Sequence, residues 1–227
     1  MRPKASERAW VFTGGFFLAG IAGFVNICLL GYFEVPVSHM TGAVARLSRD
    51  VDARDAVDLL FILYIVAGFL AGAVLSGILI GGKRLIPGRR YGITLVIEGL
   101  LIGASAWLLA QNEPMGVPLA AMACGVQNAM ASSYYGMIIR TTHMTGIITD
   151  IGIMIGHWIR HREFRFLRIM LLIFILAGFF TGGVAGALGY RVGGMEALYV
   201  PAASCILAGI GYFIWRHTGL VRVKIVN

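Results

Sequence analysis

Two nearly identical polar pentapeptides contain the residues of this chain that are best suited to bind a ligand. They are Ser38-His39-Met40-Thr41-Gly42 and Thr142-His143-Met144-Thr145-Gly146. Histidine titrates near neutral pH, so each imidazole can contact a ligand or relay a proton. Each can equally fix an irregular loop by hydrogen bonding to the backbone. We therefore predict a substrate site that contains His39, Thr41, Gly42, His143, Thr145 and Gly146.

Each pentapeptide also has the composition of a helix start. Ser38 or Thr41 in the first, and Thr142 or Thr145 in the second, can cap free backbone N–H groups. A helix N-terminus carries roughly half a positive charge and exposed donors, which favour an anion. Broken backbone at membrane depth is tolerated where protein or water satisfies it, so such segments line cavities. A small polar solute is therefore expected, with an anion slightly preferred.

Four further polar residues are candidates for the same substrate site: Glu98, Asn128, Arg140 and Asp150. An ionisable residue within an apolar stretch, as Glu98 is, costs about 3 kcal/mol on insertion scales and is a functional candidate for that reason. A structural hydrogen bond, a membrane anchor or a structural ion pair is the competing explanation for each. Two histidines without a carboxylate or thiolate cluster are a weak metal signal, so no metal site is predicted.

The elements that must position these residues are apolar. The chain has 227 residues, of which 58% are hydrophobic and only 13% charged, and its mean hydropathy is +0.81. A soluble domain has about 25% charged residues, so lipid must be part of the solvent of this chain. Each of six stretches is long enough to cross the bilayer as a helix: Trp10–Phe33, Leu59–Gly82, Tyr91–Asn112, Pro114–Ile139, Ile169–Tyr190 and Ala197–Trp215.

The net charge of +8 is distributed as membrane proteins distribute it. Fifteen of the nineteen lysines and arginines lie in the two termini, the Lys83–Arg90 loop and the Arg140–Arg168 region. These segments should face the cytoplasm, which places both termini there. The same clustering between apolar runs argues against nucleic-acid binding. The three cysteines lie in apolar runs without CxxC spacing and are expected to be packing residues.

The chain repeats itself beyond the pentapeptides. Ala67-Gly68-Phe69 matches Ala177-Gly178-Phe179, and Asn26 precedes the first pentapeptide much as Asn128 precedes the second. We predict two homologous halves, 1–115 and 116–227, within one membrane domain. Three crossings in each half would make the repeats inverted, with each pentapeptide opening a re-entrant or half-membrane helix. Eight crossings with parallel repeats are the competing topology. It is disfavoured because charged residues follow the first pentapeptide closely.

The segments Ser38–Gly42 and Gly125–Asp150 resemble the signature of the YoaK family, which are bacterial membrane proteins that bear a domain-of-unknown-function label. The resemblance covers essentially the whole chain. It implies a protein of the bacterial cytoplasmic (inner) membrane with about six spans, and it implies no particular activity.

Together, the candidate residues and the repeat favour a transporter or channel for a small solute or ion, in contact with the lipid bilayer. The alternatives are a membrane-embedded enzyme that acts on a lipid or quinone, and a membrane scaffold or sensor. The chain contains no G-x-S-x-G, H-E-x-x-H or haem-type pairing, so no cofactor is predicted. A homo-oligomer is compatible with the sequence.

Overall fold

The computed structural model is helical throughout the residues that it describes, which are 5–33, 37–53, 56–80, 89–130, 140–162 and 165–217. Apolar runs without internal breakers form the long helices, as the composition requires. In chain order the elements are α1 (Ala5–Phe33), α2 (Met40–Ala53), α3 (Ala56–Ile80), α4 (Arg89–Ala110), α5 (Gly116–Met130), α6 (Met144–His161), α7 (Phe166–Gly193), the 3-10 turn η1 (Gly194–Leu198) and α8 (Tyr199–His217).

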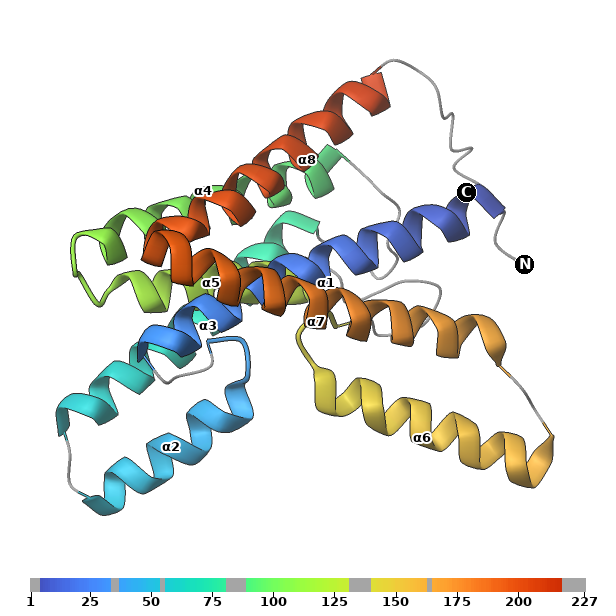
Figure 1. The fold of residues 1–227 in the computed structure, drawn as a ribbon, viewed down its shortest axis with the longest axis horizontal. Helices are drawn as coiled ribbons and strands as arrows, with labels where there is room; N and C mark the ends of the chain where they lie inside the picture. The colour runs from blue at the N-terminus through green and yellow to red at the C-terminus, as the bar shows by residue number, and fades with distance from the viewer. Residues whose placement is uncertain are drawn as a thin grey trace.

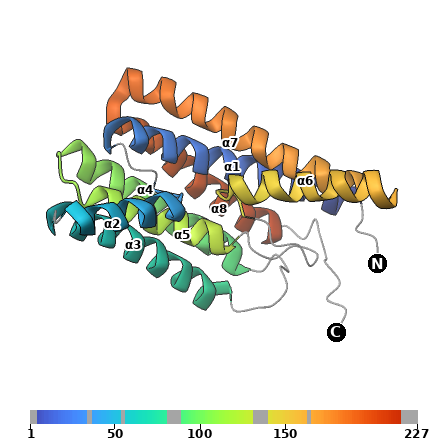
Figure 2. The same ribbon diagram turned by 90° about the horizontal axis from the view of Figure 1, so that it is seen from below.

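The long helices lie side by side and alternate in direction. Helices α1, α4 and α7 run one way along the molecule, and α3, α5 and α8 run back (Figure 1). The start of α1 and the end of α8 therefore lie at the same end. Helices α2 and α6 are different, because both begin near the middle of the molecule and run toward opposite ends (Figures 1 and 2).

Glycines bring three pairs of helices into close contact. Helix α1 packs along α7, α3 along α5, and α4 along α8, where a Cβ atom on Gly99 would overlap the carbonyl oxygen of Ala202 and one on Gly209 that of Gly92. A Cβ atom added to Gly68 or Gly72 of α3, or to Gly178 or Gly182 of α7, would overlap the backbone of the facing helix. Gly68 and Gly72 are four residues apart, as are Gly178 and Gly182, which is the small-xxx-small pattern of closely packed membrane helices.

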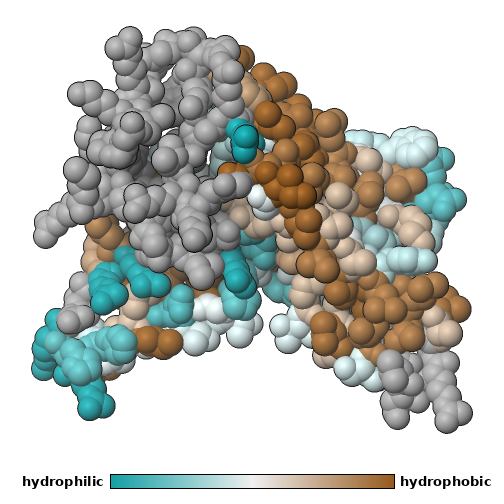
Figure 3. Space-filling model, turned by 180° about the vertical axis from the view of Figure 1, so that it is seen from behind, coloured by the Kyte–Doolittle hydropathy of each residue, from teal (hydrophilic) through white to brown (hydrophobic). Residues whose placement is uncertain are grey.

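Large apolar side chains face outward over much of the structure. Val57, Ile78, Phe180 and Val192 are each at least 70% exposed. Hydrophobic side chains form a broad band across the face seen in Figure 3, and hydrophilic ones gather mainly towards its left and right margins. An exposed apolar surface of this extent is unfavourable in water and is the normal surface of a protein in lipid.

Four stretches among the described residues are long and apolar enough to cross a membrane: Ala9–Gly31, Ala56–Ile80, Arg90–Ala110 and Phe166–Ile214. The last contains both α7 and α8, which run in opposite directions. The sequence predicts a further span over Pro114–Ile139. That stretch is helical as α5, while residues 131–139 lie outside the described part of the chain.

The reversal between α7 and α8 is tight and partly buried. Gly194 has a φ of +57°, a left-handed conformation that glycine adopts without strain. The η1 turn that follows buries Met195 and Leu198, and it contacts α1, α4, α7 and α8. One short turn thus ties four helices together at this end of the molecule.

Candidate functional site

Helices α2 and α6 start at the same position of the two pentapeptides. Met40 is the first residue of α2 and Met144 the first of α6. The carbonyl oxygen of His39 accepts from the N–H of Ala43 at 3.3 Å, and that of His143 accepts from Ile147 at 3.1 Å. His143 is the N-cap of α6 and no side chain caps this helix, so the expected threonine cap is wrong for α6. The N–H of Met144 donates to the carbonyl oxygen of Thr142 at 3.1 Å, whereas the N–H groups of Thr145 and Gly146 have no acceptor in the described part of the chain and remain available to a ligand.

The two histidines lie within electrostatic range of each other. His39 is half-buried between α1 and α2, outside the four candidate spans, and its ring meets that of Phe179 edge-on at a centroid distance of 5.9 Å. Burial lowers the pKa of His39, and the neighbouring charge of His143 lowers that pKa further. His143 is exposed, and its ring fills the space that a Cβ atom on Gly146 would occupy.

The remaining predicted residues of the two pentapeptides are accessible. Thr41, Gly42 and Thr145 are exposed. Arg140, which precedes the second pentapeptide, is also exposed, and Asp150 in α6 is half-buried. These side chains can be reached from outside, although no ligand contact tests their predicted role.

Buried amides lie behind the pentapeptides and differ between the two halves. The Oδ1 atom of Asn26 accepts from the hydroxyl of Ser38 at 2.9 Å, which ties α1 to the first pentapeptide. Among the described residues, the Oδ1 atom of Asn128 is buried without a hydrogen-bond partner. Gln127 beside it donates from Nε2 to the carbonyl oxygen of Leu18 at 2.6 Å, which links α5 to α1.

Glu98 lies elsewhere in the helix bundle. Its side chain is completely buried in α4, and in the described part of the chain its carboxyl oxygens have at most the weakly donating thiol of Cys205 as a hydrogen-bond partner. The side chains with which it interacts electrostatically are Tyr91 of α4, Cys124 of α5 and Cys205 of α8. The structure therefore surrounds Glu98 with neutral groups rather than with the two histidines.

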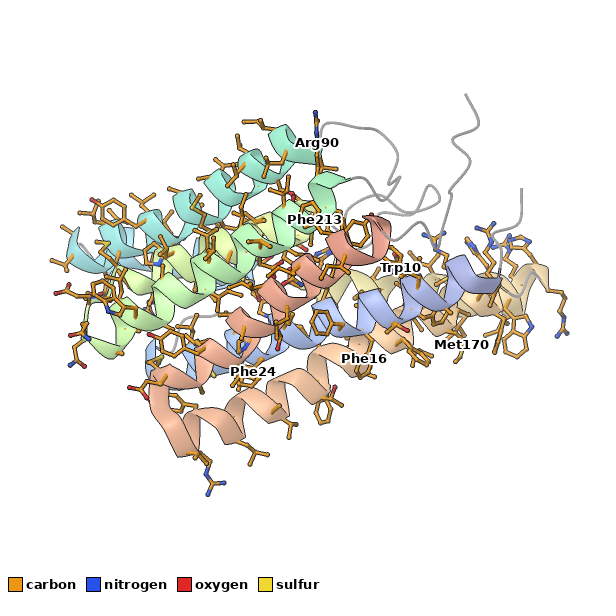
Figure 4. All side chains as sticks on the ribbon, turned by 90° about the horizontal axis from the view of Figure 1, so that it is seen from above. Trp10, Phe16, Phe24, Arg90, Met170 and Phe213 are labelled. Carbon is orange, nitrogen blue, oxygen red and sulfur yellow. The ribbon has the colours of Figure 1, made fainter. Side chains whose placement is uncertain are left out.

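A groove with a volume of about 280 Å³ lies between α1, α4 and α8. Three aromatic rings line one part of it, with centroid separations of 5.8 Å for Trp10–Tyr91, 5.7 Å for Tyr91–Tyr212 and 6.5 Å for Trp10–Tyr212. Figure 4 shows Trp10 near the end of α8, and Arg90 lies at the same end of the molecule. The full lining is Trp10, Gly14, Phe17, Leu18, Tyr91, Leu95, Ala208, Gly211 and Tyr212.

The apolar outer surface, the long helices and the buried polar residues define a multi-pass helical membrane protein. In the described residues, no group of three or more histidine, cysteine, aspartate or glutamate side chains is placed to hold a metal ion. The chain belongs to the family described as "Protein of unknown function (DUF1275)", whose model matches residues 14–211. This match confirms the resemblance to YoaK. No curated protein and no solved structure matches the chain.

Two features of the site were not anticipated from the sequence. The thiols of Cys124 and Cys205 lie beside Glu98, and only the shared apolar setting of all three residues hints at this proximity. The aromatic cluster joins Trp10 to Tyr91 and Tyr212, which lie far apart in the chain. The one feature of the sequence that indicates this cluster is the position of the three residues. All three lie near the ends of predicted spans, on the side of the membrane with more lysine and arginine.

Proposed function

We propose that this protein moves a small solute across the membrane, as a transporter or channel. The site is formed by the two pentapeptides, and an anion is the preferred substrate class. The observation that carries the proposal is the convergence of two helix starts, at Met40 and Met144, near the middle of the molecule. Interior helix starts with exposed donors bind solutes in many membrane transporters.

Reciprocal contacts support a relation between the halves by a two-fold axis. A Cβ atom on Gly72 would overlap the carbonyl of Met122, and one on Gly182 would overlap that of Gly20. Gly72 and Gly182 are equivalent positions of the repeat, 110 residues apart. Gly20 and Met122 are likewise equivalent, 102 residues apart. We infer that 1–115 and 116–227 are inverted repeats, because α1 packs on α7 as α5 packs on α3.

The length of α2 fits a half-membrane helix, and that of α6 is closer to a full crossing. At 1.5 Å per residue, the 14 residues of α2 span about 21 Å and the 18 of α6 about 27 Å, against a hydrocarbon core of about 30 Å, so α6 is assigned as re-entrant by its equivalence to α2. Six segments then cross the membrane. They are α1, α3, α4, α7, α8 and a segment that starts with α5. The distribution of lysine and arginine assigns the end where α1 starts to the cytoplasm.

The chemistry of the pair favours an anion. Two imidazoles can donate hydrogen bonds or carry positive charge, and uncapped backbone N–H groups lie at the start of α6. Arg140 adds a cation beside the second pentapeptide, and Asn128 can contribute its own N–H donors. A cationic solute would meet repulsion from the same groups, so anions should be favoured over cations of similar size.

Flux measurements on purified protein in proteoliposomes test this function. The probes are chloride, nitrate, formate, acetate, phosphate and sulfate, with potassium as the cationic comparison. We expect at least one anion to cross faster than in empty liposomes, and the double variant His39→Ala/His143→Ala to lose that flux. A matched control is His157→Ala/His161→Ala, which removes two exposed histidines of α6 outside the pentapeptide.

Labelling of single cysteines gives a second, independent test. His39→Cys and His143→Cys are introduced separately into a background without Cys28, Cys124 and Cys205, and each is treated with a membrane-impermeant thiol reagent from either side. Protection of both by the same anion is the expected result. Absence of flux for every probe, together with a stoichiometric pigment or cofactor, would instead favour a membrane enzyme.

A further inference from the structure

The carboxyl group of Glu98 is in an unusual state for an acid at this depth. Its side chain is completely buried, and among the residues that the structure describes its oxygens have at most the weakly donating thiol of Cys205 as a hydrogen-bond partner. An ionised carboxylate without a partner in an apolar interior costs several kcal/mol. In this conformation the carboxyl group is therefore neutral and holds a proton.

The two helices that pack most closely on α4, which are α5 and α8, offer Glu98 no cation as a permanent partner within their described residues. Helix α5 has no charged residue from Gly116 to Met130, and α8 has none from Tyr199 to Trp215. The titratable groups that interact with Glu98 are the thiols of Cys124 and Cys205 and the phenol of Tyr91, which are all neutral acids. A fixed salt bridge would hold Glu98 in its ionised form. In this setting, only a bound proton can neutralise the negative charge of the carboxylate.

The α1–α4–α8 groove ends one helical turn from this carboxyl group. Tyr91 and Leu95 line the groove from α4, and Glu98 is the next residue along the same face of that helix, one turn deeper. On α8, Tyr212 and Ala208 line the groove, and Cys205 continues their face by one turn. The groove thus runs from the aromatic cluster to Leu95 and Ala208, which lie one helical turn before Glu98 and Cys205.

The groove is also the place where the two halves pack differently. Helix α5 packs closely against α4, while the equivalent pair, α1 and α8, touches at only a few residues. The space left between α1 and α8 is the groove itself. If the halves exchange arrangements during transport, closing this space separates Glu98 from the outer end of the groove.

We propose that Glu98 is a proton-binding site that is reached through the α1–α4–α8 groove, and that its proton couples to movement of the solute. The carboxylate accepts a proton from water that enters the groove, and the carboxylic acid returns the proton to water when the site opens again. The coupling, unlike the proton site, rests on the transport function proposed above.

Infrared difference spectroscopy of the protein in lipid tests the proton site without any solute. The wild-type protein should show the carbonyl stretch of a protonated carboxyl group, and this band should shift in D₂O. Glu98→Gln should abolish the band, and Glu113→Gln should leave it unchanged because Glu113 is exposed. Spectra that do not differ between wild type and Glu98→Gln would overturn the proposal.

Two glycines allow the groove to be plugged. A Cβ atom added to Gly14 or Gly211 would meet nothing within 4 Å, so leucine can fill the groove at either position without displacing backbone. Gly14→Leu and Gly211→Leu should slow D₂O exchange of the Glu98 band about tenfold or more, an added barrier of about 1.4 kcal/mol. The control is Gly77→Leu on α3, where a Cβ atom also has open space. Equal exchange rates in all variants would exclude the groove as the route.

Proteoliposomes with a pH-sensitive dye inside test the coupling. Addition of an anion that the protein carries should move protons together with the solute, and Glu98→Gln should separate the two. Solute flux without proton movement would overturn the coupling, while the infrared result would still decide the proton site. Absence of all flux would count against the transport function, and the infrared bands would again decide the proton site independently.

Discussion

The helix pairs of this protein fall into two groups, one that repeats between the halves and one that does not. The pairs α1–α7 and α3–α5 are alike, because the same glycine positions meet the same backbone positions across each interface. The pairs α4–α5 and α1–α8 occupy corresponding places in the chain, yet only α4–α5 is closely packed. The glycine interfaces thus form a scaffold that is built twice, and the difference is concentrated where the groove opens.

The difference in packing between the α4–α5 and α1–α8 pairs indicates where the molecule can move. Backbone contacts across a glycine stripe are short and leave no space for sliding. The loosely packed α1–α8 pair lacks such contacts and can change its separation at lower cost. Under the proposed function, the two halves would exchange their arrangements, so that α5 separates from α4 as α1 approaches α8.

The largest expected effect tests the shared scaffold. Gly72→Val and Gly182→Val should each destabilise the fold by about 3 kcal/mol or more, because the facing carbonyl cannot move aside. The yield of monodisperse protein and its thermal unfolding in detergent measure the loss. Gly77→Val and Gly152→Val are the controls, since both positions are open. A tolerated valine at either position of the first pair would break the equivalence of the two interfaces.

The next largest effect is expected for the two histidines, whose variants test whether the halves contribute equally to solute binding. A lost hydrogen bond to a charged group costs about 1.5–3 kcal/mol, so His39→Ala or His143→Ala should lower anion flux about tenfold or more. Initial rates in proteoliposomes at saturating and limiting anion separate binding from turnover. If only one variant loses flux, the equivalence of the pentapeptides is structural and does not extend to function.

The buried amides sharpen the difference between the halves. Asn26→Leu should cost about 1–3 kcal/mol of stability, because Ser38 then loses its buried acceptor. Asn128→Leu should cost much less, since its Oδ1 atom has no partner in the described structure to lose. Thermal unfolding compares the two variants. Reduced anion flux in a stable Asn128→Leu protein would place that amide in the solute site.

The smallest effect is the pH dependence of stability that arises from His39. Burial, and then the charge of His143, lowers the pKa of His39 in the folded protein below its unfolded value of about 6.5. The unfolded state therefore binds more protons in the window below pH 6.5, and stability falls as the pH drops through it. The melting temperature in nanodiscs should show this decline. His39→Gln should flatten it, and an unchanged profile in that variant would assign the decline to another group.

Much of the fold follows from the sequence because its signals are local. Apolar length predicts where α1, α3, α4, α7 and α8 lie, and the small-xxx-small pattern predicts which faces of α3 and α7 pack closely. The pentapeptides predict the starts of α2 and α6. These predictions depend on residues that are adjacent in the chain or one helical turn apart.

The rest depends on contacts between distant segments. Nothing near Glu98 in the chain indicates that Cys124 and Cys205 surround it, because the pairing of α4 with α5 and α8 sets those neighbours. The repeat places Asn26 and Asn128 at equivalent positions before the two pentapeptides, so the same bond could be expected of both. It does not predict that the Oδ1 atom of Asn128 has no partner in the described part of the chain. The roles of the pentapeptide residues in binding stay predictions, since they need a solute to test them.

The buried η1 turn gives the molecule a pivot. It fastens one end of α8 to α1, α4 and α7. The other end of α8 lies beside Trp10, where aromatic side chains line the groove. Gly92 and Gly209 hold α8 closely along α4, so we expect a motion that widens the groove to carry α4 and α8 together away from α1. With η1 as the fixed end, such a motion would move residues near Tyr212 farther than residues near Pro201.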